Sequence, residues 1–149
     1  MDEDKKAPLF VDRISHVVGV VRPENLESAM AKMGRALQVE FEGPFLREDT
    51  GLRAGVAARA GIELIAPATP DHPLHDHLAR CGEGWFAVGF GVRDQDETGE
   101  RLRQLGQEQL QRVVRTGMTG WADDYDRIEV TIADRSIFGG LQMVFATFE

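Results

Sequence analysis

Cysteine is almost absent from this sequence, since Cys81 is the only one among 149 residues. One cysteine cannot form an internal disulfide, and a zinc site built on cysteine ligands is excluded as well. No run of apolar residues reaches the roughly 18 that cross a bilayer. Residues 1–6 contain no apolar run of the kind that a secretion signal needs. These absences predict a cytoplasmic protein without a membrane partner.

Basic side chains are also in short supply, with 17 Lys and Arg against 25 Asp and Glu and a formal net charge of −8. A surface of this sign repels a phosphate backbone, so nucleic acid is not an expected partner. Hydrophobic residues at 42% and charged residues at 28% are typical of a globular protein and argue against disorder. We expect one domain over residues 13–148, preceded by a flexible N-terminus at residues 1–12.

The order of predicted elements occurs twice along the chain. A β-branched run at residues 14–21 precedes a helix pattern that starts at Pro23 and ends near Gly34. A second run at residues 86–93 precedes a helix pattern capped by Asp94. Three further strand patterns follow each helix, and a shift of 71 residues places Val17 on Val88 and Arg22 on Arg93. We predict a duplicated βαβββ unit, with module 1 at about 13–67, a connector at 68–83 and module 2 at about 84–148.

Three segments resemble a known family. Ile14-Ser15-His16-Val17-Val18-Gly19-Val20 is similar to the opening strand of glyoxalase-like proteins, the vicinal oxygen chelate superfamily, and Ile62-Glu63-Leu64-Ile65-Ala66-Pro67 to its fourth strand. The run from Cys81 to Phe90 is most similar to methylmalonyl-CoA epimerase-type members. The resemblance implies an α+β fold: two tandem βαβββ modules form a curved mixed sheet, a cup, with helices on the outside. It also implies a homodimer and a site inside the cup.

Members of this family usually hold a divalent metal through four side chains, two from each module, and here that pattern is incomplete. His16 and Glu63 match the two ligand positions of the first module, whereas Ala87 and Val144 stand at those of the second. A shift of two residues brings in Gln142, a weaker, neutral ligand. One imidazole and one carboxylate make a poor cage for a hard octahedral metal, so no cofactor is expected. A divalent metal held by His16 and Glu63 with substituted ligands is the alternative.

The period of a strand determines which side chains share the cup face with His16 and Glu63. Bulky residues such as Phe86 fall on the opposite face, while the cup face is lined by smaller ones. The lining predicts a roomy cavity for a small-molecule ligand with a carbonyl or other polar end and an apolar body. Trp121, in an insertion at 116–126, is a candidate lid over this cavity or an oligomer contact. The expected lining residues are Val18, Val20, Ile65, Ala87, Gly89, Gln142, Val144 and Trp121.

Other polar clusters have a plainer interpretation. His72, His75 and His77 have a spacing that invites a metal, but Pro73 interrupts the helix and the last two face different directions. We interpret them as an incidental surface cluster. The acidic residues at 123–126 are interpreted as a solvated loop. Two arginines, Arg112 and Arg115, are candidates for an anionic ligand group, although solvent exposure is the default for arginine.

The functional hypotheses all rest on His16 and Glu63. Glu63 is the candidate catalytic base, and His16 donates a hydrogen bond to a substrate oxygen or orients Glu63. The same pair has a structural interpretation, because a buried imidazole and a buried carboxylate satisfy each other. The leading hypothesis is a lyase or isomerase that transfers a proton next to a carbonyl in a small molecule or acyl thioester. The alternatives are a non-catalytic protein that binds and sequesters a small molecule, and a metal-dependent epimerase-like enzyme with substituted ligands.

Overall fold

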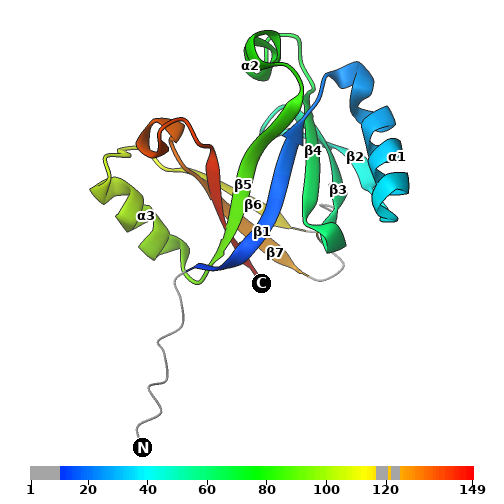
Figure 1. The fold of residues 1–149 in the computed structure, drawn as a ribbon. Helices are drawn as coiled ribbons and strands as arrows, with labels where there is room; N and C mark the ends of the chain where they lie inside the picture. The colour runs from blue at the N-terminus through cyan, green and yellow to red at the C-terminus, as the bar shows by residue number, and fades with distance from the viewer. Residues whose placement is uncertain (1–10, 117–120, 122–124) are drawn as a thin grey trace, which may run out of the picture.

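A single curled sheet of eight strands forms the body of the protein (Figure 1). The computed structural model describes residues 11–116, 121 and 125–149. The strands are arranged in the order β2-β3-β4-β1-β5-β8-β7-β6. Their bounds are β1 Val11–Val20, β2 Glu42–Arg47, β3 Leu52–Ala57, β4 Ile62–Pro67, β5 Gly84–Val92, β6 Gln111–Thr116, β7 Arg127–Ile132 and β8 Met143–Phe148.

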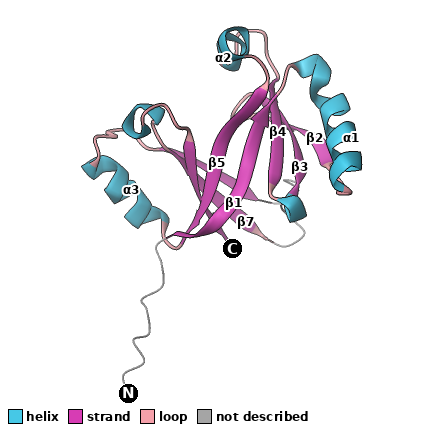
Figure 2. Ribbon diagram, viewed as in Figure 1, coloured by secondary structure: helices cyan, strands magenta, loops and turns pink. Residues whose placement is uncertain are grey.

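Three α-helices accompany the sheet, with short 3-10 turns between elements (Figure 2). None of the helices in the described ranges has the length and apolar character needed to span a membrane. The helices are α1 Leu26–Leu37, α2 Leu74–Cys81 and α3 Gln95–Gln104, and the 3-10 turns are η1 Pro23–Asn25, η2 Ala58–Ala60 and η3 Arg135–Phe138.

The pairing of the strands reproduces the predicted duplication. β1 and β5 run antiparallel at the centre, and each pairs in parallel with the last strand of its own half, β4 or β8. Val17 pairs with Ile62 in the first half, and Val88 pairs with Met143 in the second. The α+β fold of two βαβββ units in a curved mixed sheet is therefore confirmed.

This register also identifies the residues that correspond between the two halves. Val17 and Val88 are 71 positions apart, whereas Ile62 and Met143 are 81 apart, so the second half is the longer one. The residue before Val17 is His16, and the residue before Val88 is Ala87. The residue after Ile62 is Glu63, and the residue after Met143 is Val144. The second half thus has Ala87 and Val144 where the first has His16 and Glu63.

Local chemistry explains the helix ends. The Asp94 side chain accepts a hydrogen bond from the Glu97 amide at 2.8 Å and so caps α3, as predicted. Helix α1 continues beyond the expected stop at Gly34 and ends at Leu37, and the next residue, Gln38, has a left-handed φ of 54°. A side chain at Gly34 would meet the Val39 carbonyl at 2.9 Å. Glycine is therefore needed at position 34 because the chain passes close to it after the helix, and not because the helix ends there.

Two helices cover the outer face of the sheet, and the third closes one end of the cup. α1 buries Leu26 and Met30 against β4, and α3 buries Leu102 against β5 and β8. α2 instead packs Leu74 and Leu78 onto residues of the concave face. The helices of the two βαβββ units, α1 and α3, lie outside the cup as expected, and α2 belongs to the connector between the units. Because α2 seals the concave face at one end, it becomes a wall of the cavity described below.

Candidate active site

The concave face of the sheet holds a cavity of about 430 Å³. Strands from both halves, α2, η3 and the segment before α2 contribute to it, so it forms only when the two halves curve around the same space. The predicted residues His16, Val18, Glu63, Ile65, Ala87, Gln142 and Val144 all line it. Its other lining residues are Thr50, Leu52, His72, Pro73, Leu74, His77, Arg80, Phe86, Gln111, Val113, Arg115, Val130, Ile132 and Arg135.

His16 is held in place from three sides. It is 8% exposed, and its Nδ1 lies 2.9 Å from the Ser15 hydroxyl. The Trp121 ring meets its ring edge-on with centroids 5.3 Å apart. On the neighbouring strand, a side chain at Gly89 would overlap the imidazole. Burial lowers the pKa of His16 below its ordinary 6.5, against the opposing effect of the nearby Glu63 charge. We therefore take His16 as a neutral imidazole at pH 7.

The glycine beneath His16 gives a first prediction. Gly89→Ala is expected to displace the imidazole and to lower the free energy of unfolding by about 1–3 kcal/mol, the usual cost of overpacking a filled site. Gly84→Ala on the same strand is the matched control, because nothing lies within 4 Å of the added carbon. Urea denaturation measures both. Equal stability of the two variants would contradict the placement of His16.

The pKa of His16 gives a second prediction. Because the pKa is lower in the folded chain, the unfolded chain takes up this proton more readily as the pH falls. The contribution of His16 to stability is therefore complete above pH 6.5 and is lost progressively towards the lowered folded-state pKa. The His16→Gln variant should lose less unfolding free energy than wild type between pH 7.5 and 5.5. Parallel profiles of wild type and variant would count against a buried, neutral His16.

Glu63 is paired with an arginine that sequence analysis missed. The Nη2 atom of Arg47 lies 3.5 Å from Oε1 of Glu63, and the two side chains are 5% and 15% exposed. Arg47 belongs to the edge strand β2, two strands away from β4. The expected direct pair of His16 with Glu63 is therefore not the one observed: Ser15 is the hydrogen-bond partner of His16, and Glu63 affects it through its charge.

Charged side chains of alternating sign lie near Glu63, namely Arg47, Asp49 and Arg115. Arg115 donates from Nη1 to both carboxylate oxygens of Asp49, at 2.8 and 2.7 Å. Asp49 and Arg115 also lie close enough to Arg47 to affect its pKa, which burial lowers and the Glu63 charge raises. Of the two arginines considered for an anionic ligand, Arg115 lines the cavity. Arg112 instead pairs with Asp96 and Glu129 outside it.

Three residues expected in the lining lie elsewhere. Val20 packs beneath α2 against its leucines, because α2 covers that end of the concave face. Gly89 lies under the His16 ring rather than next to the cavity. Trp121 is buried behind His16 with Val56 and Ile128, so it does not cover the opening as a lid. The rest of the 116–126 insertion, residues 117–120 and 122–124, lies outside the described residues.

Phe86 lines the cavity although strand alternation placed it on the opposite face. Val18 pairs with Ala87 and the next residue, Gly19, pairs with Trp85, so Phe86 is skipped in the ladder. A bulge of this kind adds one residue to a strand and redirects its side chain. The aromatic ring therefore joins the concave face.

The histidine cluster is not simply a surface feature. His72 and His77 line the cavity, whereas His75 turns away and contacts the Thr69 carbonyl at 2.9 Å. Nδ1 of His72 accepts the Leu74 amide at 3.0 Å, so its Nε2 carries the hydrogen that faces the Thr50 carbonyl at 2.9 Å. The acidic residues Asp123 and Asp124 lie outside the described residues.

The side chains at the predicted metal positions do not fit a divalent ion. Ala87 and Val144 offer no donor, and Gln142 uses its amide oxygen on Arg135 and its amide nitrogen on the Ala133 carbonyl. The Arg47 cation lies against the Glu63 oxygen that would be a ligand. In the described part of the chain, no group of three or more His, Cys, Asp or Glu side chains is placed to hold a metal. We therefore derive no step through a metal.

A curled sheet of two βαβββ units around a central cavity defines the glyoxalase type of fold. The profile of the Glyoxalase/Bleomycin resistance protein/Dioxygenase superfamily matches residues 15–123, and the chain belongs to this superfamily. No curated protein matches the sequence.

Solved structures share the fold at low sequence identity. Methylmalonyl-CoA epimerase from Mycobacterium tuberculosis has a TM-score of 0.73 and 21% identity, over 96% of this chain and 92% of that one. A variant of the Streptomyces coelicolor methylmalonyl-CoA epimerase in complex with 2-nitronate-propionyl-CoA has a TM-score of 0.69 and 19% identity, over 93% and 98%. A methylmalonyl-CoA epimerase in complex with methylmalonyl-CoA and NH4+ has the same score and identity, over 93% and 95%.

Proposed function

We propose that this protein is a glyoxalase-like isomerase or lyase that transfers a proton at the carbon next to a carbonyl, without a divalent metal. Its substrate is a small carbonyl compound or an acyl thioester. The observation that carries the proposal is the placement of His16 and Glu63 on neighbouring strands, β1 and β4, where both line one cavity. A neutral donor next to a carboxylate is the combination that enolate chemistry needs.

Glu63 acts as the base in this proposal. Arg47 contacts Oε1 from within the protein. The Glu63 carboxylate takes the proton from the carbon. The electrons of the broken C–H bond move onto the carbonyl oxygen, and an N–H of His16 donates a hydrogen bond to it. Return of the proton to carbon completes an isomerisation. Loss of a leaving group from the adjacent carbon completes an elimination instead.

Solvent deuterium exchange tests this chemistry even when the product has not been identified. The protein is incubated in D2O with a panel of short acyl thioesters and 2-oxo or 2-substituted carbonyl compounds, and mass spectrometry follows deuterium at the carbon next to the carbonyl. The proposal predicts enzyme-dependent incorporation into at least one member of the panel. Incorporation no faster than in buffer across the panel would count against it.

A sequestering protein of the same fold is the second candidate. It is favoured by the apolar patch that Ala87, Ile132 and Val144 contribute to the cavity wall. This candidate predicts that an apolar or aromatic ligand raises the melting temperature and is recovered unchanged. Consumption of the stabilising ligand, followed over time by mass spectrometry, discriminates in favour of the enzyme.

The proposal also covers the kind of ligand, the oligomeric state, the location and the need for a metal. A ligand with a polar end at His16 and Glu63 and an apolar body against Ala87, Ile132 and Val144 suits the lining of the cavity. The homodimer and the cytoplasmic location stay predictions. A metal-dependent activity with substituted ligands is disfavoured, because Gln142 is already engaged at both ends of its amide.

A further inference from the structure

The opening of the cavity carries two arginines and a histidine that the proposed proton transfer does not use. Arg80 and His77 come from α2 and Arg135 from η3, and all three line the cavity. The Arg135 guanidinium carbon lies 5.0 Å from the centre of the Phe86 ring. The His77 ring packs edge-on against the same ring, with centroids 4.9 Å apart. Phe86 thus brings two elements that are distant in sequence to one place.

Among the described residues, Arg80 and Arg135 differ from most other arginines in having no acidic partner. Within the described residues, neither Arg80 nor Arg135 forms an ion pair: Arg80 donates to the Asp76 backbone carbonyl at 3.4 Å, and Arg135 to the Gln142 amide oxygen at 3.3 Å. The arginines that pair with carboxylates, in addition to Arg47, are Arg22, Arg53, Arg93, Arg101, Arg103, Arg112, Arg115 and Arg127.

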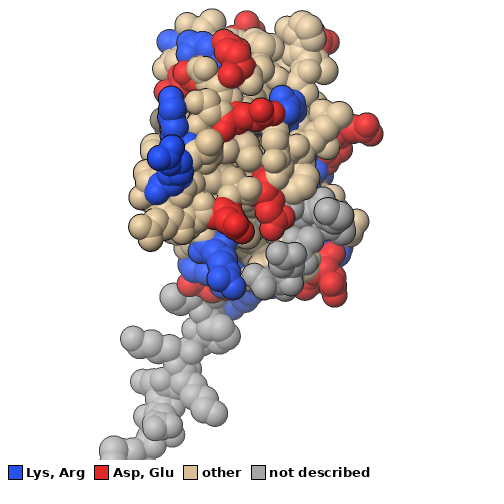
Figure 3. All heavy atoms as spheres, turned by 90° about the vertical axis from the view of Figure 1, so that its right-hand side faces the viewer, with Lys and Arg blue, Asp and Glu red and all other residues tan. Residues whose placement is uncertain are grey.

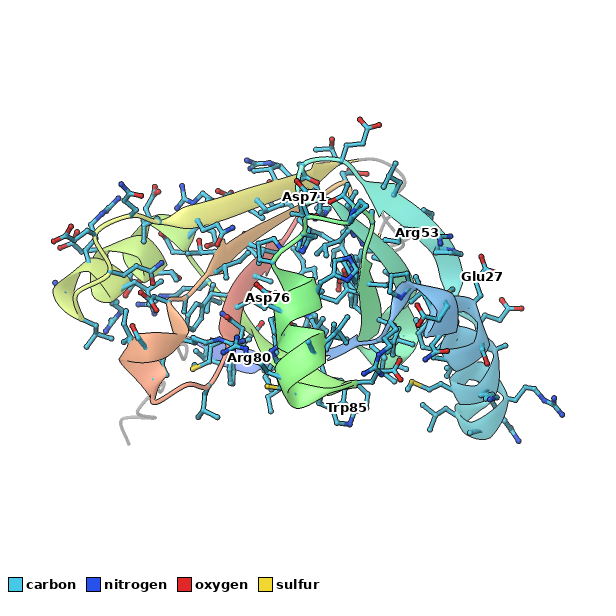
Figure 4. All side chains as sticks on the ribbon, turned by 90° about the horizontal axis from the view of Figure 1, so that it is seen from above. Glu27, Arg53, Asp71, Asp76, Arg80 and Trp85 are labelled. Carbon is cyan, nitrogen blue, oxygen red and sulfur yellow. The ribbon has the colours of Figure 1, made fainter. Side chains whose placement is uncertain are left out.

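Partial burial and the charges of Arg80 and Arg135 all affect the pKa of His77. Partial burial is the largest cause that lowers the pKa of His77, and the charges of Arg135 and Arg80 add to it. Figure 4 shows Arg80 projecting from α2. On the α1 side of the molecule, by contrast, acidic and basic side chains are interspersed over the surface (Figure 3). A cationic opening in a chain of net charge −8 is a concentrated source of attraction for an anion.

We propose that Arg80, Arg135 and His77 form a subsite for an oxyanion group of the ligand at the opening of the cavity. Guanidinium groups bind carboxylates and phosphates through paired hydrogen bonds, so both kinds of group fit. The inference rests on the proposed function, because it names the charged end of the same ligand whose carbonyl meets His16 and Glu63. The anion is either a carboxylate of a small acid or a phosphate of the coenzyme portion of an acyl thioester.

Calorimetric titration of matched anionic and neutral probes tests the subsite and separates the two sources. The carboxylate arm compares 4-phenylbutyrate with its amide. The phosphate arm compares propionyl-CoA with propionyl-pantetheine, which lacks the phosphates and the adenosine, so the arginine variant described next isolates the contribution of charge. In at least one arm, wild type should bind the anion about tenfold or more tightly than the neutral probe. The Arg80→Gln/Arg135→Gln variant should reduce this preference to about threefold or less. The arm that shows the preference identifies the source.

Arg35→Gln is the control, because Arg35 is exposed on α1, outside the cavity, and also has no ion pair among the described residues. It should keep the wild-type preference. Equal binding of anion and neutral probe by wild type, a preference that survives the double substitution, or no binding of either anion would overturn the inference. Because binding requires no turnover, Glu63→Gln should keep the anion preference even while deuterium exchange is lost. A failure of the subsite is therefore distinct from a failure of the proposed chemistry.

Discussion

Replacing Glu63 with glutamine is expected to lower deuterium exchange at least about 10³-fold, because the amide keeps the shape of the side chain but cannot accept the proton. The carboxylate lies in the cavity wall with Arg47 against one oxygen. No other carboxylate lines the cavity among the described residues. The measurement is the rate of deuterium incorporation into the substrate found with wild type.

Glu40→Gln is the matched control, since it makes the same chemical change at an exposed position outside the cavity. It should exchange deuterium at the wild-type rate. Circular dichroism at the assay temperature checks that Glu63→Gln stays folded, because the substitution also removes the partner of a buried arginine. A folded Glu63→Gln variant with wild-type exchange would eliminate Glu63 as the base.

Removal of Arg47 is expected to produce the largest loss of stability, about 3 kcal/mol for Arg47→Ala at pH 7. The substitution leaves the Glu63 carboxylate in a wall where it is 15% exposed and has no other ion-pair partner among the described residues. An isolated charge in such a place loses hydration without compensation. Urea unfolding measures the change directly.

Two comparisons separate the ion pair from simple loss of side-chain volume. Arg53 and Glu27 form an exposed pair at the same 3.5 Å separation (Figure 4), and Arg53→Ala should cost at most about 1 kcal/mol. The Arg47→Met/Glu63→Met variant should lose less stability than the sum of the two single methionine variants, because neither charge is then left alone. If the double variant loses as much stability as the two single methionine variants added together, the buried ion pair is refuted.

The fold was largely predictable because its signals are local or repeated. Strand lengths, the Asp94 cap and the recurrence at a spacing of 71 residues are all readable along the chain, and the strand register reproduces them. The same recurrence places Ala87 at the position of His16 in the second half. The counterpart of Glu63, Val144, follows only from the resemblance to the family, because the second half is longer and its last strand lies 81 rather than 71 residues on. The convergence of His16 and Glu63 on one cavity also follows from this logic, since parallel neighbours β1 and β4 point corresponding side chains to one face.

The features of the site that the sequence did not predict depend on contacts between distant segments. Arg47 reaches Glu63 from an edge strand, and an arginine near the end of a strand carries no local sign of burial. The bulge that turns Phe86 inwards arises from the pairing of β5 with β1, which strict alternation ignores. The position of α2 on the concave face, which brings His77 and Arg80 to the cavity, is likewise decided by packing of Leu74 and Leu78.

Deuterium exchange in the presence of a chelator tests the central claim most directly. If His16 and Glu63 perform the proton transfer themselves, protein purified without added metal and assayed with EDTA should exchange deuterium at the rate of untreated protein. Addition of Mg²⁺, Mn²⁺, Co²⁺ or Zn²⁺ should not increase that rate. Exchange that disappears with EDTA and returns with one of these ions would contradict the account.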